Sequence, residues 1–199
     1  ASTSSAGEYG IAKVTLSHAD TNAHLCYTLM TPGSRDSSPA AECGQAPNGC
    51  NGNSLLYSSS NGPFSVTESK TVSFVACSSN GLTSSDTVYT TVGVGSAPRV
   101  AVADRTDTDP PYATILLDDD SSGSLCYTTG DSAAGDLCNM NQDGQCNLLH
   151  SATFTGDPIS IDNSMKLHAV TCLLNHAPSS ITTVDIEVFA EPPSLMIAT

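Results

Sequence analysis

The strongest constraint on the fold of this chain is an internal repeat. The tetrapeptide Leu-Cys-Tyr-Thr occurs at residues 25–28 and again at residues 125–128, and downstream the two copies match at an offset of 95 residues. The clearest matches at this offset are residues 63–66 with 158–161 and residues 84–85 with 179–180. Self-similarity of this kind marks a repeated structural unit. The sequence therefore predicts tandem units at residues 1–95 and 96–190, followed by a short strand-like segment at residues 191–199.

Apolar residues alternate with polar residues within each copy. The alternating sets in the first copy are Val14 and Leu16, then Leu25, Tyr27 and Leu29, then Val72, Phe74 and Ala76. A period of two is typical of β-strands that bury one face, and Gly, Pro, Asn and Ser cluster between these stretches, where they indicate turns. Short strands separated by turns predict an all-β chain with a β-sandwich in each repeat.

The order of these segments resembles the chitobiase/β-hexosaminidase C-terminal-like module. The segments that carry the resemblance are an apolar strand at residues 14–17, a Tyr-Thr strand at 26–28, a Pro-Phe pair at 63–64, an apolar strand at 74–77 and a Gly-x-x-x-Ser segment at 81–85, with counterparts in the second repeat. The resemblance implies two tandem immunoglobulin-like β-sandwich domains, here stapled by disulfides. It also implies a non-catalytic accessory or scaffold module of the kind often attached to secreted hydrolases.

Each repeat carries four cysteines in the same order. They are Cys26, Cys43, Cys50 and Cys77 in the first repeat and Cys126, Cys138, Cys146 and Cys172 in the second. No two of them form a Cys-x-x-Cys pair, which disfavours zinc-ribbon and thioredoxin-like sites. An even number of cysteines without metal-site spacing is typical of disulfides formed in an oxidising compartment. We therefore expect a secreted or extracellular protein.

Four cysteines allow three pairings per repeat, and sequence spacing alone does not choose among them. In an immunoglobulin-like sandwich the Tyr-Thr strand and the strand at residues 74–77 are antiparallel neighbours, which brings Cys26 near Cys77. This topology predicts the bridges Cys26–Cys77 and Cys126–Cys172. The remaining cysteines then close short loops as Cys43–Cys50 and Cys138–Cys146.

The chain is strongly acidic, with a formal net charge of −14. Such a surface is repelled by nucleic-acid phosphates and by anionic lipids. No apolar run is long enough to span a bilayer as a helix. We therefore expect neither a nucleic-acid partner nor a membrane span.

The sequence shows no catalytic motif, so we expect a protein that is not an enzyme. Neither a Gly-x-Ser-x-Gly elbow nor a phosphate-binding loop is present. The five histidines His18, His24, His150, His168 and His176 are interpreted as surface residues, with His24 and His168 at outward strand positions. We expect no cofactor.

Two acidic or amide-rich stretches have some features of a calcium site. Asn139, Asn141 and Asp143 resemble the first half of a calcium loop, but His150 stands at the twelfth position, where such a loop requires Glu. A second group could gather from Asp104, Asp107, Asp109, Asp118, Asp119 and Asp120. We interpret the first stretch as a polar loop closed by a disulfide and the second as solvated turns.

The sequence also bears on glycosylation. It contains no Asn-x-Ser/Thr acceptor, so we expect any attached glycans to be O-linked, for example at Ser58, Ser59 and Ser60.

The repeat pattern extends into the C-terminal segment. Residues 97–103 open the second repeat, and residues 192–198 follow it at the same offset of 95, whereas residues 1–10 before the first repeat are polar. The chain therefore ends on an apolar strand without a repeat of its own, while the first repeat has no obvious first strand. An unpaired strand beside an open sheet edge invites pairing between chains. The favoured donor residues are Ser194, Leu195, Met196, Ile197, Ala198 and Thr199, and the other candidate is the segment at residues 8–13 around Tyr9 and Ile11.

Head-to-tail strand donation that does not close produces a filament. The sequence therefore predicts an extracellular structural subunit of a surface appendage or matrix whose partners are copies of itself. The alternative is a non-catalytic carbohydrate-binding or spacer module of a larger secreted hydrolase. The absence of Trp, together with only four Phe and six Tyr, disfavours a sugar-binding platform.

Overall fold

The computed structural model describes residues 2–4, 8–33, 40–44, 49–79, 83–106, 111–131, 136–139 and 144–188. In this part of the chain the only helical element is the 3₁₀ turn η1 (Ser59–Asn61), so the all-β prediction is confirmed. The chain divides into two compact units. Unit 1 is Ala1–Gly95 with Asn175–Ala177, and unit 2 is Ser96–Leu174 with Pro178–Thr199.

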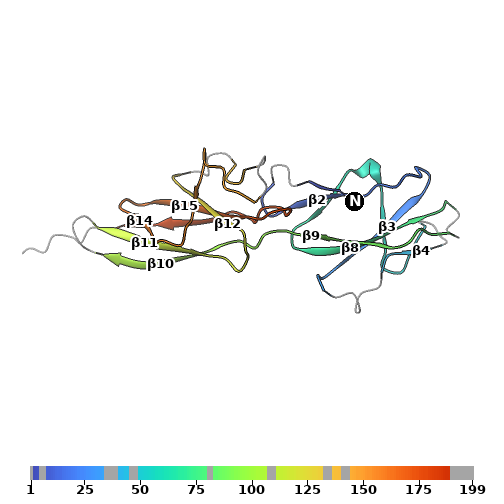
Figure 1. Ribbon diagram of the computed structural model, residues 1–199, viewed down its shortest axis with the longest axis horizontal. Helices are drawn as coiled ribbons and strands as arrows, with labels where there is room; N and C mark the ends of the chain where they lie inside the picture. Colours follow the sequence, from blue (N-terminus) through green and yellow to red (C-terminus); the bar gives the residue numbers. More distant parts are fainter. Residues whose placement is uncertain are drawn as a thin grey trace, which may run out of the picture. The chain divides into compact units, whose positions relative to one another are not determined.

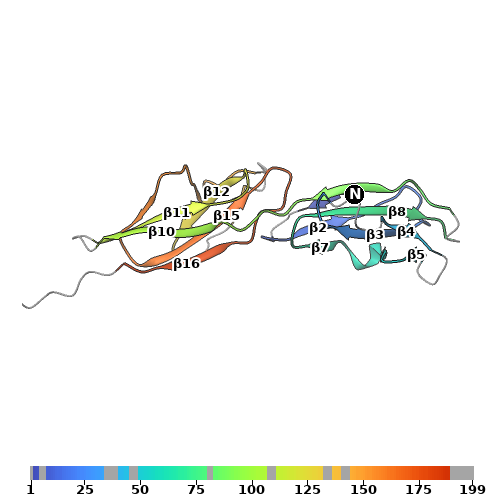
Figure 2. The same cartoon turned by 90° about the horizontal axis from the view of Figure 1, so that it is seen from below.

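Both units contain one three-stranded and one four-stranded antiparallel sheet (Figures 1 and 2). In unit 1 the sheets are β1 (Ser2–Ser4), β2 (Ala12–Thr15) and β7 (Phe64–Val66), and β6 (Leu55–Tyr57), β3 (His24–Met30), β8 (Lys70–Cys77) and β9 (Val88–Val92), in those orders. A small hairpin, β4 (Glu42–Cys43) with β5 (Cys50–Asn51), is added to them.

Unit 2 repeats this order of strands. Its sheets are β10 (Arg99–Thr106), β11 (Tyr112–Asp118) and β14 (Ile159–Ile161), and β13 (Ala152–Thr153), β12 (Ser124–Thr129), β15 (Met165–Cys172) and β16 (Thr182–Ile186). The registers also agree between the units. Ala12 pairs with Val66 in unit 1, and Ala113 pairs with Ile161 at the corresponding place in unit 2.

The alternating apolar residues of both sheets meet in one core per unit. In unit 1, Val14, Leu25, Val72 and Phe74 belong to this core, and the Tyr27 ring stacks on Phe64 with centroids 4.4 Å apart. Burial also raises the pKa of the Tyr27 phenol. The corresponding core of unit 2 contains Ile115, Leu117, Ile161, Leu167, Ala169 and Ile186. Burying side chains of this size contributes about 1.5–3 kcal/mol each, which explains why the period-two pattern recurs.

In each unit a serine side chain binds the segment that follows the last strand in the same way. In unit 1, Ser69 Oγ accepts from Val94 N at 3.1 Å and donates to Val94 O at 3.2 Å. In unit 2, Ser164 Oγ accepts from Val188 N at 2.9 Å and donates to Val188 O at 3.2 Å. Val94 and Val188 are therefore equivalent, although they differ by 94 residues rather than 95.

The offset changes from 95 to 94 in the loop that follows Cys77 in unit 1 and Cys172 in unit 2. Ala76 N donates to Ser85 Oγ at 3.0 Å, and the equivalent Thr171 N donates to Ser179 Oγ at 2.9 Å. Ser85 therefore corresponds to Ser179, and the ungapped match of residues 84–85 with 179–180 was wrong by one residue. Residues 84–85 and 179–180 are both Ser-Ser, so the ungapped alignment matched them although one residue is missing from the loop of unit 2.

Unit 1 is completed by three residues from later in the chain. Ala177 N donates to Gly93 O and Gly95 N donates to Ala177 O, both at 3.0 Å, and Ala177 is buried in the core of unit 1. A Cβ at Gly93 would stand 1.6 Å from His176 Cδ2, so a larger residue there would displace the His176 ring.

Candidate assembly edge and disulfide layers

The cysteines form four disulfides, but with pairings other than those expected. Unit 1 has Cys26–Cys50 and Cys43–Cys77, and unit 2 has Cys126–Cys146 and Cys138–Cys172. The predicted bridges Cys26–Cys77, Cys43–Cys50, Cys126–Cys172 and Cys138–Cys146 are therefore wrong. Each observed bridge joins one cysteine of the four-stranded sheet to one cysteine of the excursion that follows β3 or β12.

The register of β3 against β8 explains the error. Cys77 stands opposite His24 and Cys26 stands opposite Val75, so Cys26 and Cys77 are diagonal neighbours on one face rather than a direct pair. Their sulfur atoms lie 3.5 Å apart without a bond. Cys43 and Cys50 are direct partners in the β4–β5 hairpin, and each is bonded to a sheet cysteine. Unit 2 repeats this arrangement, with 3.3 Å between Cys126 Sγ and Cys172 Sγ.

The disulfides hold a cover over the outer face of each four-stranded sheet. The outer side chains Thr28, Met30, Ser73 and Val75 of unit 1 are buried although they point away from the core between the sheets. Ser73 Oγ accepts a hydrogen bond from Ala41 N at 3.0 Å, just before β4. The excursion is therefore a third layer that alternation within strands does not reveal.

His168 lies under the corresponding cover in unit 2, so its assignment to the surface was wrong. It is buried, with Nδ1 2.9 Å from Thr183 Oγ1 and Nε2 3.2 Å from Gly130 O. The outward strand position was right, but an outward residue is not exposed where a further layer covers the sheet. The other four histidines, His18, His24, His150 and His176, are exposed as expected.

The first strand differs strongly between the units. In unit 1 the polar N-terminal segment provides β1, which pairs with β2 at three positions, so the expectation that this unit lacks a first strand was wrong. In unit 2 the eight-residue β10 pairs with β11 at seven positions, with a bulge between Val102 and Asp104. Both first strands lie at a sheet edge. The edge position is therefore filled in both units, and the strand described there is three residues long in unit 1 and eight in unit 2.

The contacts of β10 show what a full first strand contributes. Val100 packs against the core of unit 2 and pairs with Leu117. Pro98 O, just before the strand, accepts a hydrogen bond from Thr182 Oγ1 at 2.8 Å. In unit 1, Leu16 is the equivalent of Leu117, and the described pairing of β1 with β2 ends one residue before it, at Thr15. Among the described residues, the β2 edge of unit 1 is therefore paired at Lys13, Val14 and Thr15.

Of the two candidate donor strands, one lies outside the described residues and the other within them. Residues 194–199 lie outside the described residues. Within the other candidate segment, residues 8–13, Tyr9 and Ile11 are half-buried and Ala12 begins β2, the middle strand of its sheet. Donating that segment to another copy would remove the strand that joins β1 to β7, which disfavours it as donor.

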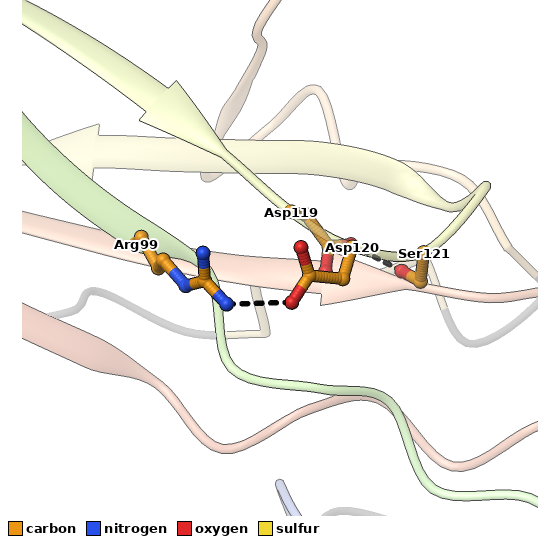
Figure 3. Close-up of polar contacts among 4 residues, drawn as sticks. All are labelled: Arg99, Asp119, Asp120 and Ser121. Atoms are coloured by element: carbon orange, nitrogen blue, oxygen red, sulfur yellow. Dashed lines mark hydrogen bonds and ion pairs between the residues drawn. The ribbon is translucent and has the colours of Figure 1, made fainter.

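The candidate calcium groups are not brought together in the described part of the chain, where no cluster of three metal-ligating side chains occurs. Asn141, Asp143, Asp107 and Asp109 lie outside the described residues, and Asn139 N donates to Gln145 O at 2.8 Å. In the turn after β11, Asp120 forms an ion pair with Arg99 at 2.7 Å, and Asp119 accepts a hydrogen bond from Ser121 (Figure 3). These contacts tie the start of β10 to the end of β11.

Two other surface features bear on function. A hollow of about 380 Å³ beside the Cys43–Cys77 bridge is lined by Ala41, Glu42, Cys43, Val75, Thr83, Ser84 and Thr87, without an aromatic ring. Ser59 and Ser60 are exposed in η1, and Ser58 Oγ lies 2.6 Å from Ser60 Oγ. These hydroxyls are accessible, and their glycosylation stays a prediction.

Comparisons with known proteins give no further guide. No family model matches the chain, and a search of curated proteins finds no relative. The resemblance to the chitobiase C-terminal-like module therefore stays a prediction. Within the described residues, no helix has the length and apolar character needed to cross a bilayer.

Proposed function

We propose that this chain is an extracellular structural subunit that assembles head-to-tail into filaments by donating a terminal strand, each unit being an immunoglobulin-like sandwich. The observation that carries the proposal is the contrast at the first-strand position. Among the described residues, unit 2 has the eight-residue β10 there, and unit 1 has Ser2–Ser4, a segment without an apolar residue. The described β1 contributes three ladder pairs and no apolar side chain, so we expect it to be easily displaced.

The sequence supplies a strand suited to replace it. Residues 194–199 read Ser-Leu-Met-Ile-Ala-Thr, and they stand after unit 2 in the place where residues 99–104 stand after unit 1. Short segments of high β-propensity without charge or proline pair readily with open edges. Because donor and acceptor lie in different parts of the chain, the contact is head-to-tail, and it propagates into a filament unless the rotation between copies closes a ring.

The disulfide layers suit such a role. Each unit keeps two bridges that do not involve the first strand, so a unit can exchange that strand while the rest of its fold stays fixed. Bridges of this kind are typical of small proteins in oxidising compartments. The proposal includes no catalytic step and no cofactor.

Electron microscopy of the native protein in negative stain tests this proposal. We expect filaments of the full chain and their loss when residues 194–199 are deleted. The pair Leu195→Ser and Ile197→Ser should also abolish them, whereas Leu148→Ser and Leu149→Ser, two strongly exposed positions in a turn of unit 2, should not. Dispersed monomers of the full chain, or filaments that persist when residues 194–199 are deleted, would exclude the proposal.

A further inference from the structure

We infer that residues 194–199 of one copy replace β1 of another copy, antiparallel to β2, with Leu195 opposite Leu16 and Ile197 opposite Val14. This inference rests on the proposed assembly and specifies its acceptor edge, its donor and its register. The site is the edge of the β1-β2-β7 sheet in unit 1, and the occupant is a second copy of this chain.

The template for this register is unit 2. Ala12 with Val66 and Ala113 with Ile161 occupy the same place in the two sheets, so Val14 and Leu16 correspond to Ile115 and Leu117. In unit 2 these two residues pair with Val102 and Val100 of β10. At the repeat offset of 95, Val100 corresponds to Leu195 and Val102 to Ile197.

The acceptor residues are already buried, so the donor would gain strand pairing and not further burial of these residues. Val14 and Leu16 are 0% and 3% exposed and face the core of unit 1. β1 places Thr3 opposite Val14, and its described pairing stops before Leu16. The donated strand would place a branched apolar residue opposite each of them and lengthen the ladder beyond three pairs. Cross-strand apolar pairs of this type stabilise antiparallel sheets.

A register shifted by one residue is the competing arrangement. The offset between the units falls to 94 at Val94 and Val188, and a strand that kept this offset would place Ser194 opposite Leu16 and Met196 opposite Val14. A slip of one residue turns every side chain to the other face. It would direct Leu195 and Ile197 toward solvent and Ser194 toward the core. The apolar pattern therefore favours the offset of 95, with one more residue in the connection after Val188.

Paired cysteines distinguish these arrangements. Thr15 is exposed and corresponds to Leu116, which pairs with Ala101, the counterpart of Met196. Directly opposed residues on one face have Cβ atoms about 4.5–5.5 Å apart, which is close to the spacing that a disulfide accepts. Chains carrying Thr15→Cys are mixed with chains carrying Met196→Cys, assembled and mildly oxidised. A link can then form only between copies, and mass spectrometry of the digest locates it.

We expect Thr15→Cys to link with Met196→Cys at least tenfold more than with Leu195→Cys, which tests the shifted register, or with Ala198→Cys, which lies one pair further along the same face. Filaments in which the Leu195→Cys link dominates, or in which no C-terminal position links to Thr15→Cys, would overturn this inference and leave the proposed assembly standing. A wild-type chain that forms no filaments would overturn both.

A peptide experiment keeps the test decisive if the cysteine variants do not assemble. A synthetic peptide of residues 190–199 should compete for the β2 edge and block growth of wild-type filaments. The same peptide with Leu195→Ser and Ile197→Ser should not block it. Equal inhibition by the two peptides, or none by either, would contradict the assignment of Leu195 and Ile197 as the inward residues.

Discussion

At the scale of single residues, two buried hydroxyls of unit 2 differ in their hydrogen bonding, and removing them should have opposite effects on the free energy of unfolding. Thr171 is fully buried, and its Oγ1 has no hydrogen-bond partner among the described residues. Ser179 is equally buried, but its Oγ accepts from Thr171 N and donates to Ser180 O, both at 2.9 Å. An unsatisfied buried hydroxyl costs free energy, whereas a satisfied one stabilises.

We therefore expect Thr171→Val to leave the free energy of unfolding unchanged or to raise it by about 1 kcal/mol. Ser179→Ala, the matched control, should lower it by about 1–3 kcal/mol, because Thr171 N loses its acceptor in a buried place. Urea denaturation of the oxidised protein measures both. A larger loss for Thr171→Val than for Ser179→Ala would show that the Thr171 hydroxyl is satisfied.

At the same scale, alternation indicates which face Cys26 and Cys77 occupy but not the partner of either. Cys26 and Cys77 do lie on the face opposite Leu25 and Phe74, as the period of two requires. Pairing depends on a third layer, and the β4–β5 hairpin that forms it has strands of only two residues. Strands of that length carry no readable period, so the sequence offered no signal for them.

The hairpin leads to a prediction at the scale of secondary-structure elements. Cys26→Ser with Cys50→Ser removes one bridge and should lower the free energy of unfolding by about 2–4 kcal/mol. Cys26→Ser with Cys77→Ser removes one partner from each of two bridges and should cost more. Thermal unfolding and peptide mapping of the unreduced protein measure the effect. A smaller loss of stability for the second variant than for the first would indicate that Cys26 is bonded to Cys77.

The first strand of unit 1 leads to another prediction at this scale. If displacement of β1 limits assembly, a stronger β1 should slow it. Thr3→Val places an apolar β-branched residue opposite Val14, and a cross-strand pair of this kind worth about 1 kcal/mol would make displacement about fivefold less favourable. Thr91→Val, at an exposed position of the edge strand β9, is the matched control. Light scattering follows filament growth, and an unchanged rate for Thr3→Val would argue against displacement of β1.

Most of the order of the strands was predictable because the apolar pattern of each strand occurs twice in the sequence, once in each repeat. Val14 and Ile115, or Phe74 and Ala169, mark the same buried faces in both units. β1 was missed because Ser2–Ser4 has no apolar residue, and its position is set by pairing with β2 instead of by its own sequence. That dependence on the neighbouring strand is also the reason why we propose that it can be replaced.

At the scale of the whole molecule, the net charge of −14 leads to the last prediction. Like charge on every subunit opposes side-by-side contact between filaments, and this repulsion reaches about 30 Å in 0.01 M salt but only about 3 Å in 1 M salt. The donated strand instead relies on backbone hydrogen bonds and on apolar contacts, which salt does not weaken. Lateral bundling should therefore increase with salt while filament length is retained.

Pelleting at low speed and electron microscopy in 0.01 M and 1 M sodium chloride separate these two effects. We expect single dispersed filaments at low salt and bundles of equally long filaments at high salt, with sucrose of matched osmolality as the control for non-ionic effects. Bundling that does not depend on salt would mean that lateral contacts are not limited by charge. Filaments that shorten as salt rises would mean that charge pairs, rather than an apolar strand, hold successive subunits together.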